Sequence, residues 1–291
     1  GIYGGRFMKE KEVSVSVIMG VYNQWDEQIL QKAVESILNQ SFKDFEFIIY
    51  DDGSQPHAAL MLEKIKQLDP RIVLIGQREN HGLAFSLNSC IEHAKGRYIA
   101  RMDADDISDP GRLQEQYDFM ESHPEYSWCG CNAKLLDDNG IWGMATRPER
   151  PTENDYLKFS PYIHPTVMYR ASLFEETEGY KVSKETLLCE DYELFMRLRQ
   201  LGKKGYNIQK PLFTYREDAN SYKRRDLNRS INEAKVRYVN FKKMHILFPK
   251  GWIYVIRPIA ACMIPRDLLY KVKRKKSWKK EIKTELIITG K

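Results

Sequence analysis

Short apolar runs alternate with segments of helical spacing along the first half of the chain, and this alternation most constrains the fold. The runs SVSVIMGV, FEFIIY, RIVLIGQ and RYIARM are β-rich, and turn-forming or polar residues follow them. Between the first two runs, apolar residues recur at helical spacing, at Leu30, Ala33, Val34 and Ile37. Strands that alternate with helices in this way favour a mostly parallel α/β sheet with right-handed crossovers.

The pattern also predicts the order of elements and the limits of the domain. We expect helices over residues 29–40, 58–68, 83–94, 112–122, 191–200 and 229–243, and a strand in HPTVMYR. Residues 1–7 are interpreted as a vector remnant before Met8. Residues 8–225 are expected to form the main domain, and residues 226–291 a helical, basic C-terminal extension.

Charge and length narrow the function classes. The chain has 291 residues, is 42% hydrophobic and carries a formal net charge of +6. Most of the positive excess follows Arg216, whereas acidic clusters dominate before it. No helix-turn-helix, zinc-finger or RRM signature is present, so we expect no nucleic-acid partner. We see no signal peptide and no apolar run long enough to cross a bilayer.

The five cysteines fit neither a zinc site nor a disulfide framework. Cys129 and Cys131 are one residue apart, which on a strand places them on the same side, and we expect them to be buried small side chains. The cysteines suggest a reducing compartment.

Acidic clusters stand beside the predicted strands and helices. They are Asp51-Asp52 after FEFIIY, Asp103-Ala104-Asp105-Asp106 after RYIARM, and Glu190-Asp191 before YELFMRL. Crowded carboxylates are unfavourable unless a cation neutralises them. Ligands of open α/β sheets bind at the carboxyl ends of strands. The pattern therefore predicts an enzyme that holds a divalent metal and a phosphorylated ligand.

The DADD cluster is the best candidate for the metal site. Asp103 and Asp105 alternate along an extended segment and can share one face. Oxygen ligands of this kind suit Mg²⁺ or Mn²⁺, which leave positions open for substrate phosphates. Asp106 is expected to point elsewhere and cap the following turn. The alternative is a solvated acidic turn before a helix.

The other two clusters each have a structural alternative. Asp52 could accept a hydrogen bond from a bound base while Gly53 lets the backbone turn, or DDGS could be an ordinary strand-to-helix turn. Glu190 and Asp191 could cap the helix that they open, or one of them could be a general base facing a cleft.

The motifs VSVIMGVYN, DDGS, NHGLAFSLN, RYIARMDADD and CEDYELFMRL occur in an order and spacing that resembles the family 2 glycosyltransferases. The resemblance covers about Val13 to Arg216. It implies a GT-A fold, which is a mostly parallel Rossmann-like sheet flanked by helices, over residues 8–225. The basic helical extension would follow this domain.

The resemblance also implies a nucleotide site. Val21, Tyr22 and Asp52 would contact the base. Asn80 and Gly82 would line the nucleotide pocket.

The remaining acidic residues would then serve the chemistry. By the same resemblance, Asp103 would hold the nucleotide and, with Asp105, the Mn²⁺ or Mg²⁺ that bridges its phosphates. Asp191 would be the catalytic base, with Glu190 positioning base or acceptor. Such enzymes invert the anomeric carbon in one in-line displacement.

Two further positions are less constrained. His164 occupies a place where similar sequences often carry a histidine facing the sugar, although a satisfied, partly buried histidine fits equally well. Many relatives have a histidine after the equivalent of Arg216, but this chain reads Glu217 to Ser221 there, so no third protein ligand is assigned. Arg216 and residues 223–225 could cover the diphosphate, or form a solvated basic loop.

The stretch from Trp252 to Trp278 mixes apolar, aromatic and basic residues and is interrupted by Pro258 and Pro265. Its basic end could lie on an anionic membrane surface, or the segment could pack on the domain. We favour the membrane.

Together these features predict an inverting transferase that moves a hexose or N-acetylhexosamine from a UDP-sugar to a hydroxyl of a glycan. The glycan is expected to be linked to polyprenyl diphosphate, in bacterial cell-surface polysaccharide synthesis. The enzyme would be cytoplasmic and peripheral at the inner face of the plasma membrane. A catalytically silent nucleotide- or glycan-binding relative is the alternative. A nucleotidyltransferase is disfavoured, because GVYNQWDEQ is not a Gly-rich phosphate loop.

Overall fold

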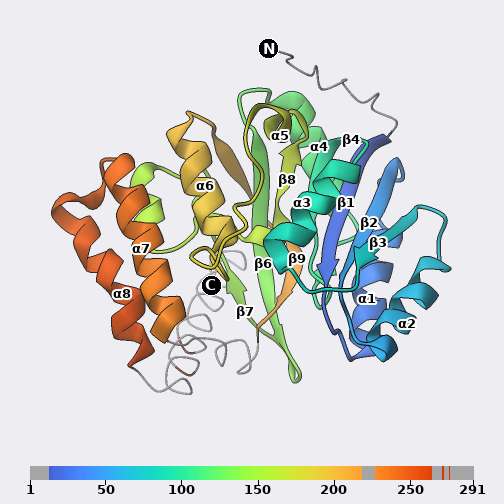
Figure 1. The fold of residues 1–291 in the computed structure, drawn as a ribbon. Helices are drawn as coiled ribbons and strands as arrows, with labels where there is room; N and C mark the ends of the chain where they lie inside the picture. Colours follow the sequence, from blue (N-terminus) through green and yellow to red (C-terminus); the bar gives the residue numbers. More distant parts are fainter. Residues whose placement is uncertain (1–12, 218–226, 264–270, 272–274, 276–291) are drawn as a thin grey trace, which may run out of the picture.

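A computed structural model describes residues 13–217 and 227–263, and the single positions 271 and 275. Its strands form one sheet in the order β3-β2-β1-β4-β8-β6-β9-β5, with β7 paired to β6 (Figure 1). The strands span β1 Val13–Val21, β2 Phe45–Asp52, β3 Ile72–Gln77, β4 Gly96–Arg101, β5 Ile107–Ser108, β6 Trp128–Asp137, β7 Gly140–Ala145, β8 Met168–Arg170 and β9 Gly205–Arg216.

Helices separate most of these strands in the sequence. They are α1 Glu27–Leu38, α2 Pro56–Lys66, α3 Leu83–His93, α4 Arg112–Ser122, α5 Ser172–Glu176, α6 Glu190–Gln200, α7 Leu227–Lys243 and α8 Trp252–Cys262. Short helical turns occur at Glu153–Leu157, His164–Thr166 and Leu247–Gly251.

The two faces of the sheet bury different side chains, because successive strand residues point to opposite sides. From β1, Val17 and Met19 join one apolar cluster, which also contains Leu30 of α1 and Leu113 of α4. Ile18 joins the other cluster, with residues of α3, α6 and α7. Helices therefore cover both faces, as the alternating pattern predicts.

The two strands that carry acidic motifs, β2 and β4, flank β1. β1 is parallel to both β2 and β4, and β2 is parallel to β3. Val21 pairs with Asp51, and Ile18 with Arg101, so the carboxyl ends of β1, β2 and β4 share one edge. Beyond β4 the sheet becomes mixed, since β8 is antiparallel to β4 and β6, while β9 is parallel to β6.

One expectation about local structure is wrong. HPTVMYR is not all strand: His164–Thr166 form a short helical turn, and β8 covers only Met168–Arg170. Pro165 lacks the N–H that a strand ladder needs. Pro258 lies inside α8 and is buried there.

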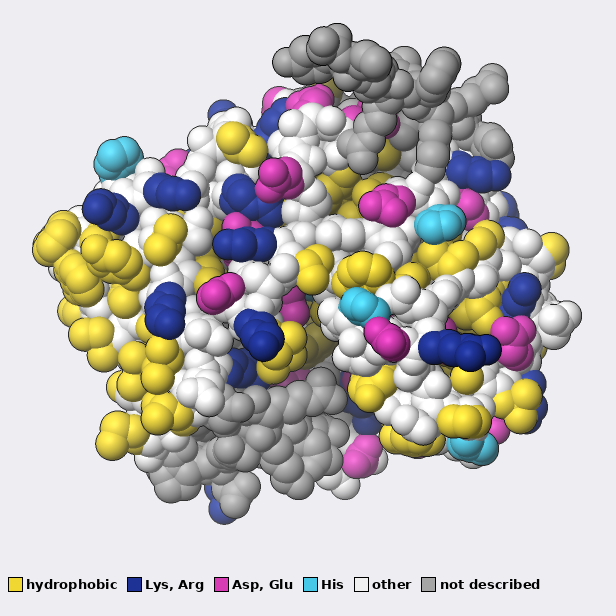
Figure 2. Space-filling view, viewed as in Figure 1, with side chains coloured by type: hydrophobic (Ala, Val, Ile, Leu, Met, Phe, Trp, Pro, Cys, Tyr) yellow, Lys and Arg dark blue, Asp and Glu magenta, His cyan; other side chains and the backbone are white. Residues whose placement is uncertain are grey.

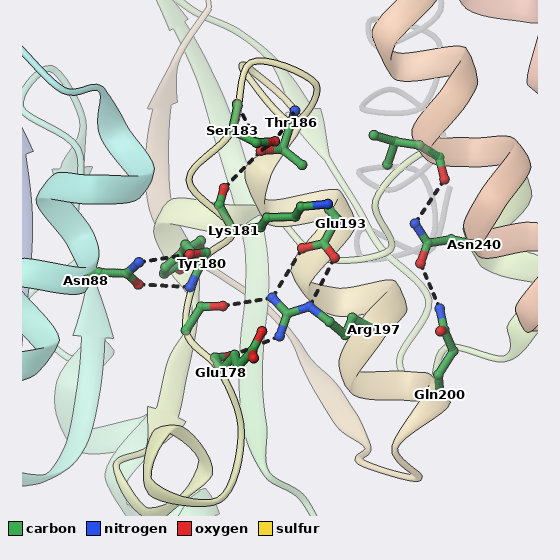
Figure 3. A network of polar contacts seen from close by, with 12 residues as sticks. Asn88, Glu178, Tyr180, Lys181, Ser183, Thr186, Glu193, Arg197, Gln200 and Asn240 are labelled. Carbon is green, nitrogen blue, oxygen red and sulfur yellow. Dashed lines mark hydrogen bonds and ion pairs between the residues drawn. The ribbon is translucent and has the colours of Figure 1, made fainter.

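The C-terminal helices α7 and α8 lie beside α6 at one end of the molecule (Figure 1). Ala234, Phe241 and Val255 belong to the same apolar cluster as Leu194 of α6. Gln200 Nε2 of α6 donates to Asn240 Oδ1 of α7 at 2.8 Å (Figure 3). The predicted extension is thus continuous with the core of the domain over the described residues.

The predicted basic segment from Lys271 to Lys280 lies outside the described residues, apart from the single positions 271 and 275. Within the described ranges, none of the helices combines the length and apolar character needed to cross a membrane.

Candidate active site

Asp52 at the end of β2 organises the loop that precedes α3. Its side chain is 2% exposed. Its Oδ2 accepts hydrogen bonds from Asn80 Nδ2 at 2.9 Å and from the backbone N–H of Gly82 at 2.8 Å. Its Oδ1 accepts from the backbone N–H of His81 at 2.9 Å. Burial raises the pKa of Asp52, and these hydrogen bonds oppose the shift. The structure therefore brings together Asp52, Asn80 and Gly82, the last at φ 89°.

The loop after β1 is tied to the same turn. The backbone N–H of Asn23 donates to Ser54 Oγ at 3.0 Å, and Asn23 Oδ1 accepts from the N–H of Gln55 at 2.7 Å. Val21 is buried in the core, whereas Tyr22 is 52% exposed. Of these two predicted base contacts, Tyr22 has the side chain available to a ligand.

The DADD motif follows β4 and contains both half-buried and buried carboxylates. Asp103 and Asp105 are half-buried, and Asp103 Oδ1 pairs with Arg101 Nη1 at 2.7 Å. Asp106 is 1% exposed, and its Oδ1 accepts from the backbone N–H of Arg216 in β9 at 2.7 Å. Asp106 thus links two strands instead of capping the next turn, where Asp109 Oδ1 accepts from the N–H of Gly111 at 3.0 Å.

This cluster has the chemistry expected of a divalent-metal site. Burial, and then the charges of Asp103 and Asp105, hold the pKa of Asp106 well above its usual range, so the carboxylates are close enough to destabilise one another. No group of three metal-ligating side chains converges in the part of the chain that the structure describes. Asp103 and Asp105 would therefore supply two oxygen ligands and leave the other positions to phosphate oxygens or water, which fits Mg²⁺ or Mn²⁺.

Glu190 and Asp191 are the first residues of α6. Glu190 is 6% exposed and Asp191 is half-buried. Burial, reinforced by the neighbouring Glu190 carboxylate, raises the pKa of Asp191 to about 6. Backbone N–H groups at the start of the helix oppose this shift without cancelling it. Asp191 therefore combines partial access with a pKa suited to accepting a proton near neutral pH.

His164 contacts Tyr180 and lies within reach of the charge of Arg101. Its Nε2 is 2.7 Å from Tyr180 Oη, which is 3.2 Å from Tyr169 Oη. Burial, and then the charge of Arg101, hold the pKa of His164 well below its usual range, so the ring is neutral. His164 is thus a partnered histidine, as one of the two sequence interpretations has it, and its role toward a sugar stays a prediction.

Tyr180 and Arg101 connect the two acidic motifs. The charges of Asp191 and Asp103 both act on the pKa of Tyr180, and the charge of Arg101 acts on the pKa of Asp191. The fold therefore gathers DADD and Glu190-Asp191 around one centre, although they are far apart in the sequence.

Sequence reasoning missed three side chains of this centre: Arg101, Tyr180 and Arg147. Arg147 follows β7, donates from Nε to Ser160 O at 3.1 Å and lies 4.6 Å from the Phe159 ring centroid. Burial lowers the pKa of Arg147 to about 10, and the charges of Glu217 and Asp191 oppose this. A cation inside the apolar run RYIARM was the available signal for Arg101.

Arg216 lies next to this centre but is engaged elsewhere. Its Nη1 pairs with Asp138 Oδ1 at 2.9 Å, at the turn between β6 and β7. Residues 223–225 lie outside the described ranges, so the predicted cover over a diphosphate stays a prediction.

A comparison with known protein families assigns the chain to one of them. The sequence profile of Glycosyl transferase family 2 matches residues 16–178. The chain belongs to this family. The matched range includes the DDGS, NHG and DADD motifs and ends before α6.

Relatives of this glycosyltransferase extend over nearly the whole chain. EpsE of Bacillus subtilis, which carries the provisional name of a glycosyltransferase, is 36% identical over 263 residues, covering 90% of this chain and 94% of EpsE. The amylovoran biosynthesis glycosyltransferase AmsE of Erwinia amylovora is 27% identical and covers 89% of this chain and 99% of AmsE. The O-antigen biosynthesis glycosyltransferase WbnJ of Escherichia coli is 32% identical, covering 63% of this chain and 71% of WbnJ.

Solved structures confirm the GT-A type of fold. The S. aureus TarS 1–349 structure with UDP-GlcNAc superimposes with a TM-score of 0.62 at 16% identity, covering 86% of this chain and 71% of that one. The mannosyltransferase PcManGT from Pyrobaculum calidifontis, with GDP-Man and Mn²⁺, gives a TM-score of 0.62 at 14% identity. The superposition covers 97% of this chain and 86% of PcManGT. At these identities the likeness concerns the fold alone.

Proposed function

We propose that this glycosyltransferase moves a hexose or N-acetylhexosamine from a UDP-sugar to a glycan hydroxyl, with inversion of the anomeric carbon. The observation that carries the proposal is the convergence of two acidic motifs on one centre. One motif is suited to a metal and a diphosphate. The other provides Asp191, a desolvated carboxyl with a pKa raised to about 6.

Asp191 would accept the proton of the acceptor hydroxyl as that oxygen attacks the sugar. Its ionised form predominates above its own pKa, so it is available as a base at neutral pH. Glu190 raises the proton affinity of Asp191 and so increases its strength as a base. The neutral pair His164–Tyr180 would border the sugar without adding charge.

Asp103 and Asp105 would hold Mn²⁺ or Mg²⁺, which neutralises the departing diphosphate when it is bound. Arg101 fixes Asp103 through their ion pair. The Asp52–Asn80–Gly82 loop and the exposed ring of Tyr22 would receive the base and ribose. Arg216 would contribute to the diphosphate site by rearranging from Asp138.

The setting is inferred from the relatives. AmsE and WbnJ are named for amylovoran and O-antigen biosynthesis, which supports cell-surface polysaccharide synthesis as the process. We propose a glycan acceptor on polyprenyl diphosphate, and a cytoplasmic enzyme at the inner face of the plasma membrane. The basic segment at residues 271–280 would contribute to membrane attachment.

The test is nucleotide release from UDP-, GDP- and dTDP-linked sugars in the presence of Mn²⁺, repeated with EDTA. We expect release from a UDP-sugar, its loss with EDTA and its recovery with added Mn²⁺. Release from a GDP-sugar only would refute the choice of donor. UDP binding without release from any donor, even with glycan acceptors, would identify a catalytically silent relative.

A further inference from the structure

The outward side of α8 is apolar. Ile253 is 70% exposed, Ile256 is 55% exposed and Met263, just after the helix, is 84% exposed. Val255 and Pro258 on the other side are buried. Arg257 is the one charged residue in α8. A surface helix normally turns polar residues outward, so this helix has an apolar face that the described protein leaves uncovered.

Aromatic residues extend this face toward α7. Phe248, in the turn before α8, is 72% exposed, and its ring centroid lies 5.9 Å from that of Trp252. The ring centroid of Trp252 in turn lies 5.3 Å from that of Tyr238 in α7, and both side chains are 37% exposed. Figure 2 shows hydrophobic side chains gathered at the edge of the molecule where α8 lies in Figure 1. We call this surface the α8 face. It comprises Tyr238, Phe248, Trp252, Ile253, Ile256 and Met263.

The charged side chains of the stretch that carries the α8 face are all cationic. From Ala234 to Met263 the sequence contains neither Asp nor Glu. The exposed cations of this stretch are Lys235, Lys242, Lys243, Lys250 and Arg257. An apolar, aromatic surface among lysines and arginines is typical of proteins that lie on anionic membranes.

We propose that the α8 face docks on an anionic lipid bilayer. Phe248, Trp252 and Ile253 would enter the headgroup region, where aromatic rings are favoured. The surrounding cations would lie against the lipid phosphates. The charge pattern selects lipid over a second copy of the chain, because a symmetric dimer through this face would bring the same cations together.

Docking would also orient the active site. Arg229 Nη2 of α7 donates to Leu188 O at 3.3 Å, directly before the helix that begins with Glu190 and Asp191. Asn240 of α7 joins Gln200 at the other end of that helix (Figure 3). The membrane-bound helices and the helix that carries the base are therefore connected at both ends. The biological purpose of this contact, access to a lipid-linked acceptor, rests on the proposed function, but the contact itself does not.

The experiment is co-sedimentation of the full chain with phosphatidylcholine vesicles, with and without phosphatidylglycerol. The test variant is Ile253→Ser/Ile256→Ser. The control is Leu60→Ser/Ile141→Ser, which removes two side chains that are 58% and 56% exposed elsewhere on the surface. We expect binding to anionic vesicles, about tenfold weaker binding of the test variant, and unchanged binding of the control. Thermal unfolding of each variant checks that the fold is retained.

Three results would overturn the proposal. Equal binding of the two variants would show that the basic C-terminal segment alone attaches the protein. A dimer that the test variant dissociates in sedimentation velocity, without vesicle binding, would make the face a contact between copies. Absence of vesicle binding by the unaltered chain would show that the protein does not dock on anionic bilayers. Metal-dependent nucleotide release without vesicles, measured in parallel, tests the proposed function separately, and both variants should retain it.

Discussion

Desolvation sets the properties of the residue on which the proposed chemistry depends. Asp191 is half-buried beside Glu190, and both features raise its pKa, to about 6. A carboxyl with an unperturbed pKa would be a weaker base. Backbone hydrogen bonds at the start of α6, and then the charge of Arg101, oppose the rise in this pKa.

Replacing Asp191 with Asn should abolish sugar transfer, with kcat falling by roughly 10²–10⁴-fold, because no proton acceptor remains. In the unaltered enzyme, kcat/KM should rise with pH and reach half its plateau near pH 6, where Asp191 becomes ionised. Initial rates from pH 5 to 8 measure both effects. Wild-type turnover in Asp191→Asn would exclude this residue as the base.

The same substitution should stabilise the protein. Because the pKa of Asp191 is higher in the folded state, its protonated form adds stability at low pH, and this contribution is lost as the pH rises through about 6. Asn cannot ionise, so at pH 7.5 the Asp191→Asn variant should have a free energy of unfolding ~1–3 kcal/mol higher than the wild type. It should therefore also unfold at a higher temperature. The difference should vanish near pH 4. Calorimetry at the two pH values measures it, and an equal difference at both would contradict the electrostatic explanation.

Asp52 gives a second prediction at the level of a single residue. Asp52→Ala removes the acceptor for three N–H groups and should cost about 1–3 kcal/mol of stability. It should also weaken UDP binding, because the loop of Asn80 and Gly82 loses its anchor. Calorimetric UDP titration and thermal unfolding measure the two effects. Asp26→Ala, which removes one hydrogen bond at the start of α1, is the control and should leave UDP affinity unchanged.

At the level of elements, the segment before α6 is held from two sides. Asn88 of α3 exchanges two hydrogen bonds of 2.8 Å with the backbone of Tyr180 (Figure 3). Arg197 of α6 donates to Glu178 O at 2.9 Å and Gly179 O at 2.7 Å. A Cβ at position 179 would lie 2.4 Å from Asn88 Oδ1, so a larger residue than Gly179 would displace the Asn88 side chain from this contact. These contacts place Tyr180 between the two acidic motifs.

Asn88→Ala should therefore loosen the segment from Glu178 to Leu188. We expect a loss of about 1–3 kcal/mol and a lower kcat with a nearly unchanged KM for the nucleotide sugar, because the nucleotide loop is not touched. Asn88→Asp keeps the acceptor for the Tyr180 N–H. Its stability and kcat should therefore lie between those of the wild type and those of Asn88→Ala. Limited proteolysis measures the loosening. Cleavage of Asn88→Ala at the wild-type rate would contradict this role.

At the level of the whole molecule, α7 and α8 share a core with the catalytic domain. Phe241 is fully buried in the cluster that includes α6 residues and part of the sheet. The boundary expected near residue 225 is therefore not a boundary in packing.

Phe241→Ala should destabilise the entire protein by about 3–5 kcal/mol, because it leaves a cavity in a shared core. We expect one cooperative urea transition that shifts as a unit for both fluorescence and far-UV circular dichroism. Tyr238→Ala, one turn earlier and 37% exposed, is the matched control and should cost much less. Two separate transitions, with only the first affected, would show that the extension folds independently.

Much of the fold could be predicted because its signals are local. The runs around Val17, Ile48 and Ile99 are short and apolar, and the helices repeat every 3.6 residues, so order, type and approximate limits of the elements follow from short windows. The helical turn at His164–Thr166 escaped prediction, since packing decides whether a proline such as Pro165 continues or ends an element. Arg101 escaped because, although it pairs with the neighbouring Asp103, the groups on which its charge also acts, Tyr180 and Asp191, come from distant segments.

The sequence by itself determined that carboxylates stand at the carboxyl ends of strands β2 and β4 and open α6, because strand and helix patterns are properties of neighbouring residues. The tertiary structure decided what these carboxylates meet. Asp106 accepts from the backbone N–H of Arg216, 110 residues away, and His164 contacts Tyr180, whose backbone N–H donates to Asn88. It also decided which groups lose water, and desolvation is the largest cause of the raised pKa of Asp191. Both depend on long-range packing, in which the energy of a group is set by neighbours that the linear sequence does not name.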